Sequence, residues 1–285
     1  MGAPAGSVPG VSTPPPTHVR ATFGLRGAQD EEPHGQGWRF GDVVLTPVED
    51  HARATWSAGV RETLAVDGLR MARPVRSTDG RWVVSGWSAD TFLAGEPEPR
   101  HDEVVQVAGR LHSATAGLPC PRFLGAAARG ADTAVLTLAD RAAWGEDMEP
   151  FSDVPGPAAA LDPPSVTLFR DLARARRRVL GTPQVVHGDL FGTVLFAGSA
   201  DPGIVDITPY WHPASWAAAV AVVDAVAWGG SDEGLVDRWS EQEDWPQVLL
   251  RAVLFRLAVH TLHARSTPEG FPGLARTADL VRQHL

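Results

Sequence analysis

Two aspartates at the ends of apolar segments are the residues of this chain best suited to chemistry. Asp189 lies in VVHGDLFGTVLF (185–196), a polar break between two predicted strands, and it follows Gly188, which allows a sharp turn. Asp206 ends an apolar strand in GIVDITPYW (203–211). Two carboxylates at the mouths of adjacent strands suit phosphoryl transfer, in which one orients a hydroxyl and the other holds Mg²⁺ against a polyphosphate. The alternatives are a structural turn aspartate at 189 and a plain strand end at 206.

The composition excludes several other mechanisms. All 25 basic residues are arginines, because the sequence contains no lysine. Schiff-base catalysis, a Walker-A lysine and a Ser-x-x-Lys acylase are therefore excluded, and no G-x-S-x-G nucleophile elbow is present. The single cysteine, Cys120, allows neither an intrachain disulfide nor a cysteine-based zinc cluster, so we expect a cytoplasmic protein. The net charge of -9 argues against a nucleic-acid or membrane-surface partner, and the longest apolar run (216–228) is too short to span a bilayer.

The N-terminal third is predicted to form a small antiparallel sheet with one inserted helix. Residues 1–17, rich in Gly, Pro and Ser, are predicted to be a disordered tail. WRFGDVVLTPVE (38–49) and RWVVSGWSADTFLAG (81–95) each predict two strands joined by a turn. Between them, HARATWSAGVRETLAVDGL (51–69) has apolar residues at helical spacing. We therefore expect one small, β-rich lobe over residues 18–95.

Residues 96–285 are predicted to form a larger, mostly helical lobe. DEVVQVAGRLHSATAGL (102–118) is amphipathic, and SVTLFRDLARARRRVLG (165–181) predicts a helix closed by its final glycine. Residues 145–164 predict a loop. Asp224 lies in an apolar helix and needs a polar partner, either an arginine or the loop around Asp189. The fold class is therefore α+β and two-lobed, with a cleft between the lobes as the natural ligand site.

The segments VVHGDLFGTVLF and GIVDITPYW together resemble the catalytic core of the aminoglycoside phosphotransferase and choline kinase superfamily. That superfamily has a bilobal protein-kinase-like fold and the signature H-G-D, then an Asn, then an Asp after an apolar strand. The order GDVVLTPVED, RWVVSGW, VVHGDL, IVDITPYW is similar to an actinobacterial branch of it. The resemblance runs from about residue 20 to the C-terminus, with its specific motifs in 185–211. It implies ATP and Mg²⁺ as cofactors and a hydroxyl of a small molecule or peptide as acceptor.

The resemblance also implies roles for the polar residues of the large lobe. Asp189 matches the catalytic aspartate that orients the acceptor hydroxyl, and His187 matches the histidine that braces this loop. Asp206 matches the Mg²⁺-binding aspartate. The asparagine that holds a second Mg²⁺ should fall at 193 or 194, where this chain has Thr193 and Val194. A hydroxyl is a weaker metal ligand than an amide carbonyl, so Thr193 is either a metal ligand or a simple strand residue.

In the small lobe, Gly35 and Gly37 of HGQGWRF match the tip of the phosphate-covering loop, and Phe92 of ADTFLAG lies at the hinge that holds adenine. The third strand should carry a lysine that pairs with the phosphates, but that position is Thr46. A threonine cannot neutralise phosphate charge. The loss of the lysine's positive charge should lower the rate on the order of 10²-fold. The arginines placed to substitute for the lysine are Arg39, Arg53 and Arg61.

Two functions follow from these residues. The first is an ATP-dependent O-phosphotransferase, which the intact Asp189 and Asp206 favour. The second is a pseudokinase that serves as a binding or scaffolding subunit with a protein partner, which Thr46 and Thr193 favour.

Overall fold

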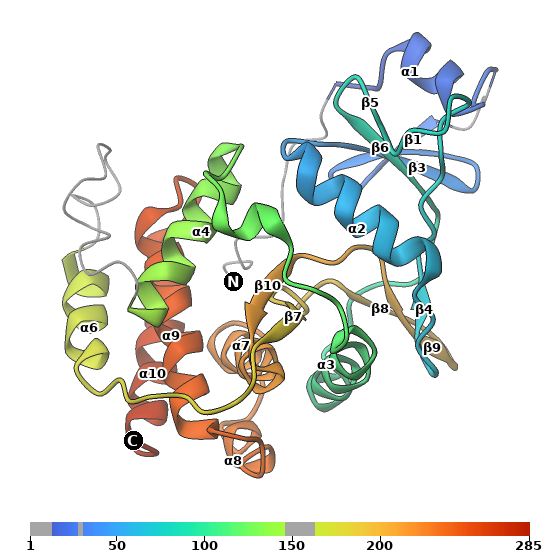
Figure 1. The fold of residues 1–285 in the computed structure, drawn as a ribbon. Coiled ribbons are helices and arrows are strands. Elements are labelled where there is room, and N and C mark those ends of the chain that lie inside the picture. The colour runs from blue at the N-terminus through green and yellow to red at the C-terminus, as the bar shows by residue number, and fades with distance from the viewer. Residues whose placement is uncertain (1–12, 28–30, 146–162) are drawn as a thin grey trace.

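The small lobe is built on a five-stranded antiparallel sheet. The computed structural model describes residues 13–27, 31–145 and 163–285. The strands lie in the order β1 (Glu31–His34), β2 (Gly37–Phe40), β3 (Val43–Pro47), β6 (Trp87–Thr91) and β5 (Val83–Val84). Tight turns at 41–42 and 85–86 join β2 to β3 and β5 to β6, which confirms both predicted hairpins. Figure 1 shows this sheet beside the helical lobe.

The two faces of this sheet have different partners. Phe40, Leu45 and Ala89 are buried on one face against Val19 and Phe23. These two residues come from helix α1 (Thr17–Thr22) and its C-terminal end, a helix that the sequence did not predict and that begins at the last residue of the predicted tail. Of that tail, residues 1–12 lie outside the described part of the chain.

Because side chains alternate along a strand, Thr46 and Asp90 lie on the face opposite Leu45 and Ala89. That face meets helix α2 (His51–Thr63), the helix predicted between the hairpins. The helix begins where the Asp50 side chain accepts hydrogen bonds from the amides of Ala52 and Arg53.

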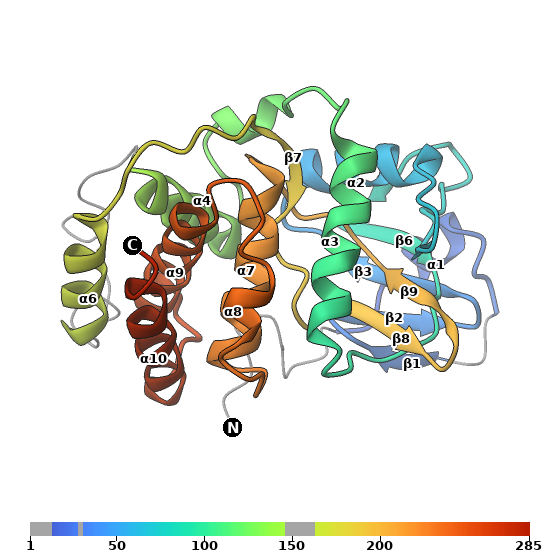
Figure 2. The ribbon, with the colours of Figure 1, turned by 90° about the horizontal axis from the view of Figure 1, so that it is seen from below.

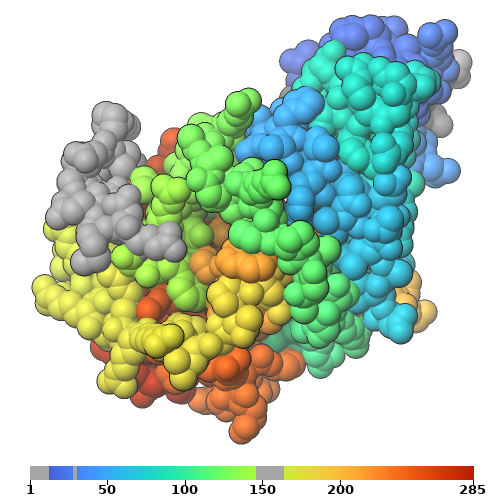
Figure 3. Space-filling view, viewed as in Figure 1, coloured from blue at the N-terminus to red at the C-terminus, as the bar shows by residue number. Residues whose placement is uncertain are grey.

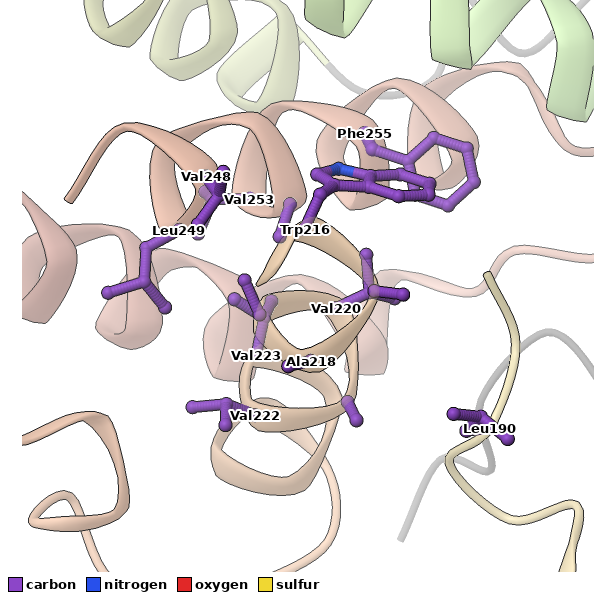
Figure 4. Packing of buried hydrophobic residues seen from close by; sticks show 14 of the residues in the cluster. Leu190, Trp216, Ala218, Val220, Val222, Val223, Val248, Leu249, Val253 and Phe255 are labelled. Carbon is purple, nitrogen blue, oxygen red and sulfur yellow. The ribbon is translucent and has the colours of Figure 1, made fainter. Parts of the chain in front are cut away.

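The large lobe is mostly helical, as predicted. Its helices are α3 (His101–Thr115), α4 (Ala131–Trp144), α6 (Pro163–Ala173), α7 (Ala214–Ala227), α8 (Leu235–Arg238), α9 (Trp245–Leu262) and α10 (Phe271–Arg282), with 3-10 turns η1 (Arg122–Gly125) and η2 (Pro268–Gly270). Figure 4 shows α7 and α9 packing through Trp216, Val223, Val248 and Phe255 in the main core. In Figure 2, α3 stands between these helices and the small lobe. Among the described residues, no helix is long and apolar enough to cross a membrane.

Two small sheets position the polar loops of the large lobe. Strand β7 (Gln184–His187) pairs with β10 (Pro209–His212), and β9 (Ala200–Ile204) pairs with β8 (Val194–Ala197) and, in parallel, with β4 (Arg70–Met71). Asp189 follows β7 and Asp206 follows β9. The expectation that these two strands are adjacent is therefore wrong, because each pairs within a different sheet.

The helix predicted over residues 165–181 ends early, at Ala173. Side chains at the N-terminal end of α9 accept hydrogen bonds from the backbone amides that would have continued the helix. Gln247 accepts from the amide of Arg177, and Asp244 accepts from the amides of Leu180 and Gly181. Gly181 therefore does not cap a helix, and it packs against Pro213. The loop predicted over 145–164 lies largely outside the described residues.

Candidate phosphotransfer site

The loop that carries Asp189 is shaped by close packing at Gly188. A Cβ at this position would overlap the ring of Tyr210, which lies on the neighbouring strand β10. The glycine is therefore required by this close approach, whereas the sequence had suggested that it was required by a sharp turn. The packing fixes the direction in which the chain leaves β7 and so places Asp189 at the end of that strand.

His187 ties the two aspartate-bearing loops together. Its buried Nδ1 accepts hydrogen bonds from the amide of Asp189 (3.4 Å) and the amide of Thr208 (3.3 Å). The His187 amide in turn donates to Nε2 of His112 on α3 (2.9 Å). Burial lowers the pKa of His187, against the opposite effect of Asp189 and Asp206, so the ring is neutral and Nδ1 can accept. These hydrogen bonds are the contacts through which His187 would have the bracing role that the resemblance implies.

Asp189 is held from the opposite side by a buried arginine. Nη2 of Arg256 on α9 donates a hydrogen bond to Asp189 Oδ1 (3.2 Å). Arg256 also forms a bidentate pair with Asp224 on α7, in which Nε lies 2.7 Å from Asp224 Oδ1. The Asp189 side chain is 42% exposed and Asp224 is 1% exposed. The predicted arginine partner of Asp224 is therefore confirmed. The catalytic candidate is linked through Arg256 to the core of the large lobe.

Asp206 is held by helix α2 of the small lobe. The Ser57 hydroxyl donates to Asp206 Oδ1 (2.5 Å), and Arg61 Nε lies 3.6 Å from the same oxygen. Arg61 also donates to Asp90 Oδ1 (2.6 Å) on β6. Burial opposes the charge on Arg61, but Asp90 and Asp206 outweigh it and raise the pKa of Arg61 above its ordinary value. The cluster therefore joins the two lobes at the carboxylate expected to bind metal.

The donors near Asp206 fit one divalent cation better than two. The Asp206 side chain is 59% exposed and both of its protein contacts fall on Oδ1, which leaves Oδ2 for a cation. Thr193, the candidate second ligand, donates its hydroxyl to the carbonyl of Asp189 (2.6 Å). The sequence contains no asparagine to replace it. Within the described ranges, no group of three or more His, Cys, Asp or Glu side chains could hold a metal by itself.

The glycines of the small lobe form a tight hairpin between β1 and β2. Gly35 has a φ of +55°, which glycine adopts without strain, and a Cβ at Gly37 would overlap the carbonyl oxygen of Leu45. Gly37 therefore lies close to Thr46 on β3. The Phe92 amide donates to the carbonyl of Asp42 (2.8 Å), so this amide is engaged within the lobe. The Arg39 guanidinium lies 3.6 Å from the Phe92 ring centroid.

Four residues of this site escaped the sequence analysis: Ser57, Asp90, His112 and Arg256. Ser57 and Arg61 are four residues apart on α2, a spacing that places both on one helix face. The apolar sequence around Arg256 was a usable signal, because a buried arginine requires an acidic partner. For Asp90 and His112 no local pattern indicates a role, because their partners are distant in the chain.

Similar solved structures are aminoglycoside phosphotransferases. The crystal structure of the enzyme from Alicyclobacillus acidocaldarius has a TM-score of 0.55 and 15% identity, and the match covers 96% of this chain and 95% of that one. A thermostable mutant of APH(4)-Ia in complex with ADP and hygromycin B has a TM-score of 0.53 and 12% identity, covering 93% and 96%. Spectinomycin phosphotransferase APH(9)-Ia in complex with ADP and spectinomycin has a TM-score of 0.52 and 10% identity, covering 90% and 91%. No family model and no curated protein matches the sequence.

These likenesses show the fold of the chain. It is the two-lobed, kinase-like α+β fold of the aminoglycoside phosphotransferases, which confirms the fold class that the sequence predicts. Figure 3 shows the two lobes meeting along α2 and the segment that follows α3. The ring contact between Trp56 of α2 and Phe123 of η1 (6.0 Å between centroids) belongs to this junction.

Proposed function

We propose that this chain is an ATP-dependent phosphotransferase that moves the γ-phosphoryl group to a hydroxyl of a small molecule or peptide. One observation carries the proposal: the loops bearing Asp189 and Asp206 donate to the same nitrogen of His187, which holds the two carboxylates in one region. In this reading residues 18–95 form the nucleotide lobe and 96–285 the catalytic lobe. Gly35, Gly37 and the hinge around Phe92 would cover the nucleotide.

Asp189 would orient the acceptor hydroxyl and take its proton. Arg256 holds Oδ1 of this carboxylate, so Oδ2 is the oxygen left for the acceptor. Asp206 would hold Mg²⁺ through Oδ2, and Thr193 could add its hydroxyl oxygen only as a weak ligand. When bound, Mg²⁺ would neutralise charge on the transferring phosphoryl group. Catalysis in this reading rests on positioning and charge neutralisation.

The hinge would bind adenine through its free amides. The amide of Phe92 is taken by Asp42, while those of Leu93 and Ala94 have no backbone acceptor among the described residues. We propose these two amides as the adenine donors.

On the acceptor side, Asp140 of α4 contacts His212 (2.7 Å), whose ring stacks on Trp144. This group would line the acceptor pocket.

The pseudokinase is the alternative, and the environment of Thr193 favours it. Its hydroxyl is already bonded to the Asp189 carbonyl, and Thr46 brings no charge to the phosphate position. In that case the chain would be a binding or scaffolding subunit with a protein partner, and Asp189 and Asp206 would have no role in turnover.

Calorimetry with Mg·ATP, followed by ATP turnover with candidate acceptors, separates the two functions. For the phosphotransferase we expect nucleotide binding in the wild type and in Asp189→Asn, with turnover lost only in that variant. Asp279→Asn, an exposed change on α10, is the matched control and should leave both unchanged. Binding without turnover in the wild type would support the pseudokinase. An absence of binding at millimolar Mg·ATP would refute the nucleotide-dependent proposals.

A further inference from the structure

We infer that Arg53 is the cation that binds the nucleotide phosphates in place of the missing lysine. This inference rests on the proposed function. The sequence offers three arginines for the role, and their surroundings in the structure distinguish them.

Arg61 is the less accessible candidate, because the residue is buried and both Nε and Nη1 of its guanidinium donate to protein groups. It donates to the carbonyl of Ala72 (3.0 Å), to Asp90 and to the Ser57 hydroxyl, and it lies beside Asp206. The residue is only 4% exposed. This burial leaves little surface for a phosphate, and the contact with Asp206 assigns Arg61 the role of positioning that carboxylate.

Arg39 is excluded by its place along the sheet. It lies two residues beyond Gly37 on β2, and its guanidinium covers the ring of Phe92 at the hinge. It also donates to the carbonyl of Gly41 (2.7 Å) and to Glu32 (3.0 Å). The phosphates would lie under the glycine hairpin, about 7 Å further along the strand at the usual rise per residue. Arg39 therefore belongs to the adenine end of the cleft.

Arg53 has the position and the free donors that the role needs. It precedes Ser57 by one helical turn, so both side chains project from the same face of α2. This face lies against the segment that begins at Asp206. Its Nη1 reaches the carbonyl of Pro209 at 3.4 Å, and its Nε lies 3.7 Å from Asp50, whose Oδ1 caps the helix. These contacts are long, and the side chain is 19% exposed. The guanidinium is therefore held in place without its hydrogen-bonding capacity being used up.

Arg53 lies near the loop of Asp189, because it contacts the carbonyl of Pro209, which precedes Tyr210 on β10. The Tyr210 ring packs on Gly188, next to Asp189. Burial raises the pKa of Tyr210; Asp140 and Asp189 raise it further, while Arg256 and Arg53 lower it. The charges of Arg53 and Asp189 thus act on one hydroxyl. A phosphoryl group between Asp189 and Asp206 would lie beside two carboxylates, and Arg53 is a partly exposed cation that could offset their charge.

Parallel calorimetric titrations with Mg·ATP and with adenosine test the inference, because only ATP carries phosphates. We expect Arg53→Gln to weaken Mg·ATP binding by about tenfold or more, the usual effect of losing a charged hydrogen bond, and to leave adenosine binding unchanged. Arg53→Lys should restore part of the ATP affinity. Arg39→Gln should weaken ATP and adenosine equally. Arg174→Gln, an exposed change, is the control and should change neither.

Glutamine at position 53 keeps a donor for the Pro209 carbonyl, so a purely structural role would leave both affinities unchanged. An unchanged ratio of ATP to adenosine affinity in Arg53→Gln, with normal wild-type binding, would overturn this inference and leave the proposed function standing. A selective loss of ATP affinity in Arg39→Gln would assign the role to that residue and also overturn it. A wild type that binds no Mg·ATP would overturn both proposals.

Discussion

Replacing Arg256 by methionine should both destabilise the protein and slow phosphotransfer, for separate reasons. In the large lobe, Arg256 forms a bidentate pair with Asp224, which is 1% exposed, and a single contact with Asp189, which is 42% exposed. Removing the arginine leaves a buried carboxylate without its partner, a change that costs about 3–5 kcal/mol. The half-exposed Asp189 contact adds about 1 kcal/mol or less. Nearly all of the lost stability should therefore arise at Asp224.

The double variant Arg256→Met/Asp224→Leu separates the two effects. It removes both buried charges and replaces them by apolar side chains, so we expect stability within about 1 kcal/mol of the wild type. Phosphotransfer should remain low, because Asp189 Oδ1 has lost the group that orients it. Urea denaturation measures the first effect, and turnover with a saturating acceptor measures the second.

Two results would refute this reasoning. If the destabilisations of Arg256→Met and Asp224→Leu simply add in the double variant, the two side chains do not act as a pair. If the double variant regains wild-type turnover, Arg256 does not position Asp189. Arg282→Met, which breaks an exposed i,i+3 pair with Asp279, is the matched control and should change stability by about 0.5 kcal/mol or less.

Three further changes have definite expected outcomes. Ser57→Ala should reduce turnover about tenfold with a loss of stability of about 1 kcal/mol, because Asp206 loses its hydroxyl donor; comparing the Mg²⁺ dependence of turnover in both proteins checks this. Gly188→Ala should destabilise the fold by about 1–3 kcal/mol, because the new methyl overlaps the Tyr210 ring, as denaturation midpoints would show. Burial raises the pKa of Asp224 from 3.8 to about 6, so the folded state takes up a proton between these values and the unfolded state does not. Relative to Asp224→Asn, the wild type should therefore gain up to about 3 kcal/mol of stability as the pH falls from 7 to 4, while its turnover falls below pH 6; denaturation and turnover profiles test both.

Local sequence was sufficient where the structure depends on neighbours in the chain. The turns at 41–42 and 85–86 are each flanked by segments with alternating apolar residues. Both hairpins could therefore be predicted from their own segments. The polar break after Val186 likewise marked the loop of Asp189. These features depend on backbone preferences and side-chain alternation over a few residues, which a single segment carries in full.

Local sequence was not sufficient where a partner comes from a distant part of the chain. The segment 165–181 has a continuous helical pattern. The helix nevertheless ends at Ala173, because Asp244 and Gln247 accept hydrogen bonds from backbone amides of the following residues. Propensity is worth only a few tenths of a kcal/mol per residue, and such tertiary hydrogen bonds outweigh it.

The sequence by itself indicated the residues proposed for the chemistry, His187, Asp189 and Asp206, in a chain without lysine. Only the tertiary structure decided how they are held. Ser57 and Asp206 are 149 positions apart, and Arg256 and Asp189 are 67 apart. The accessibility of the three arginines in the small lobe was also decided by the tertiary structure, because Arg61 is buried whereas Arg53 is partly exposed. The reason is physical: a side chain's charge is set by its type, but its availability is set by what the fold packs around it.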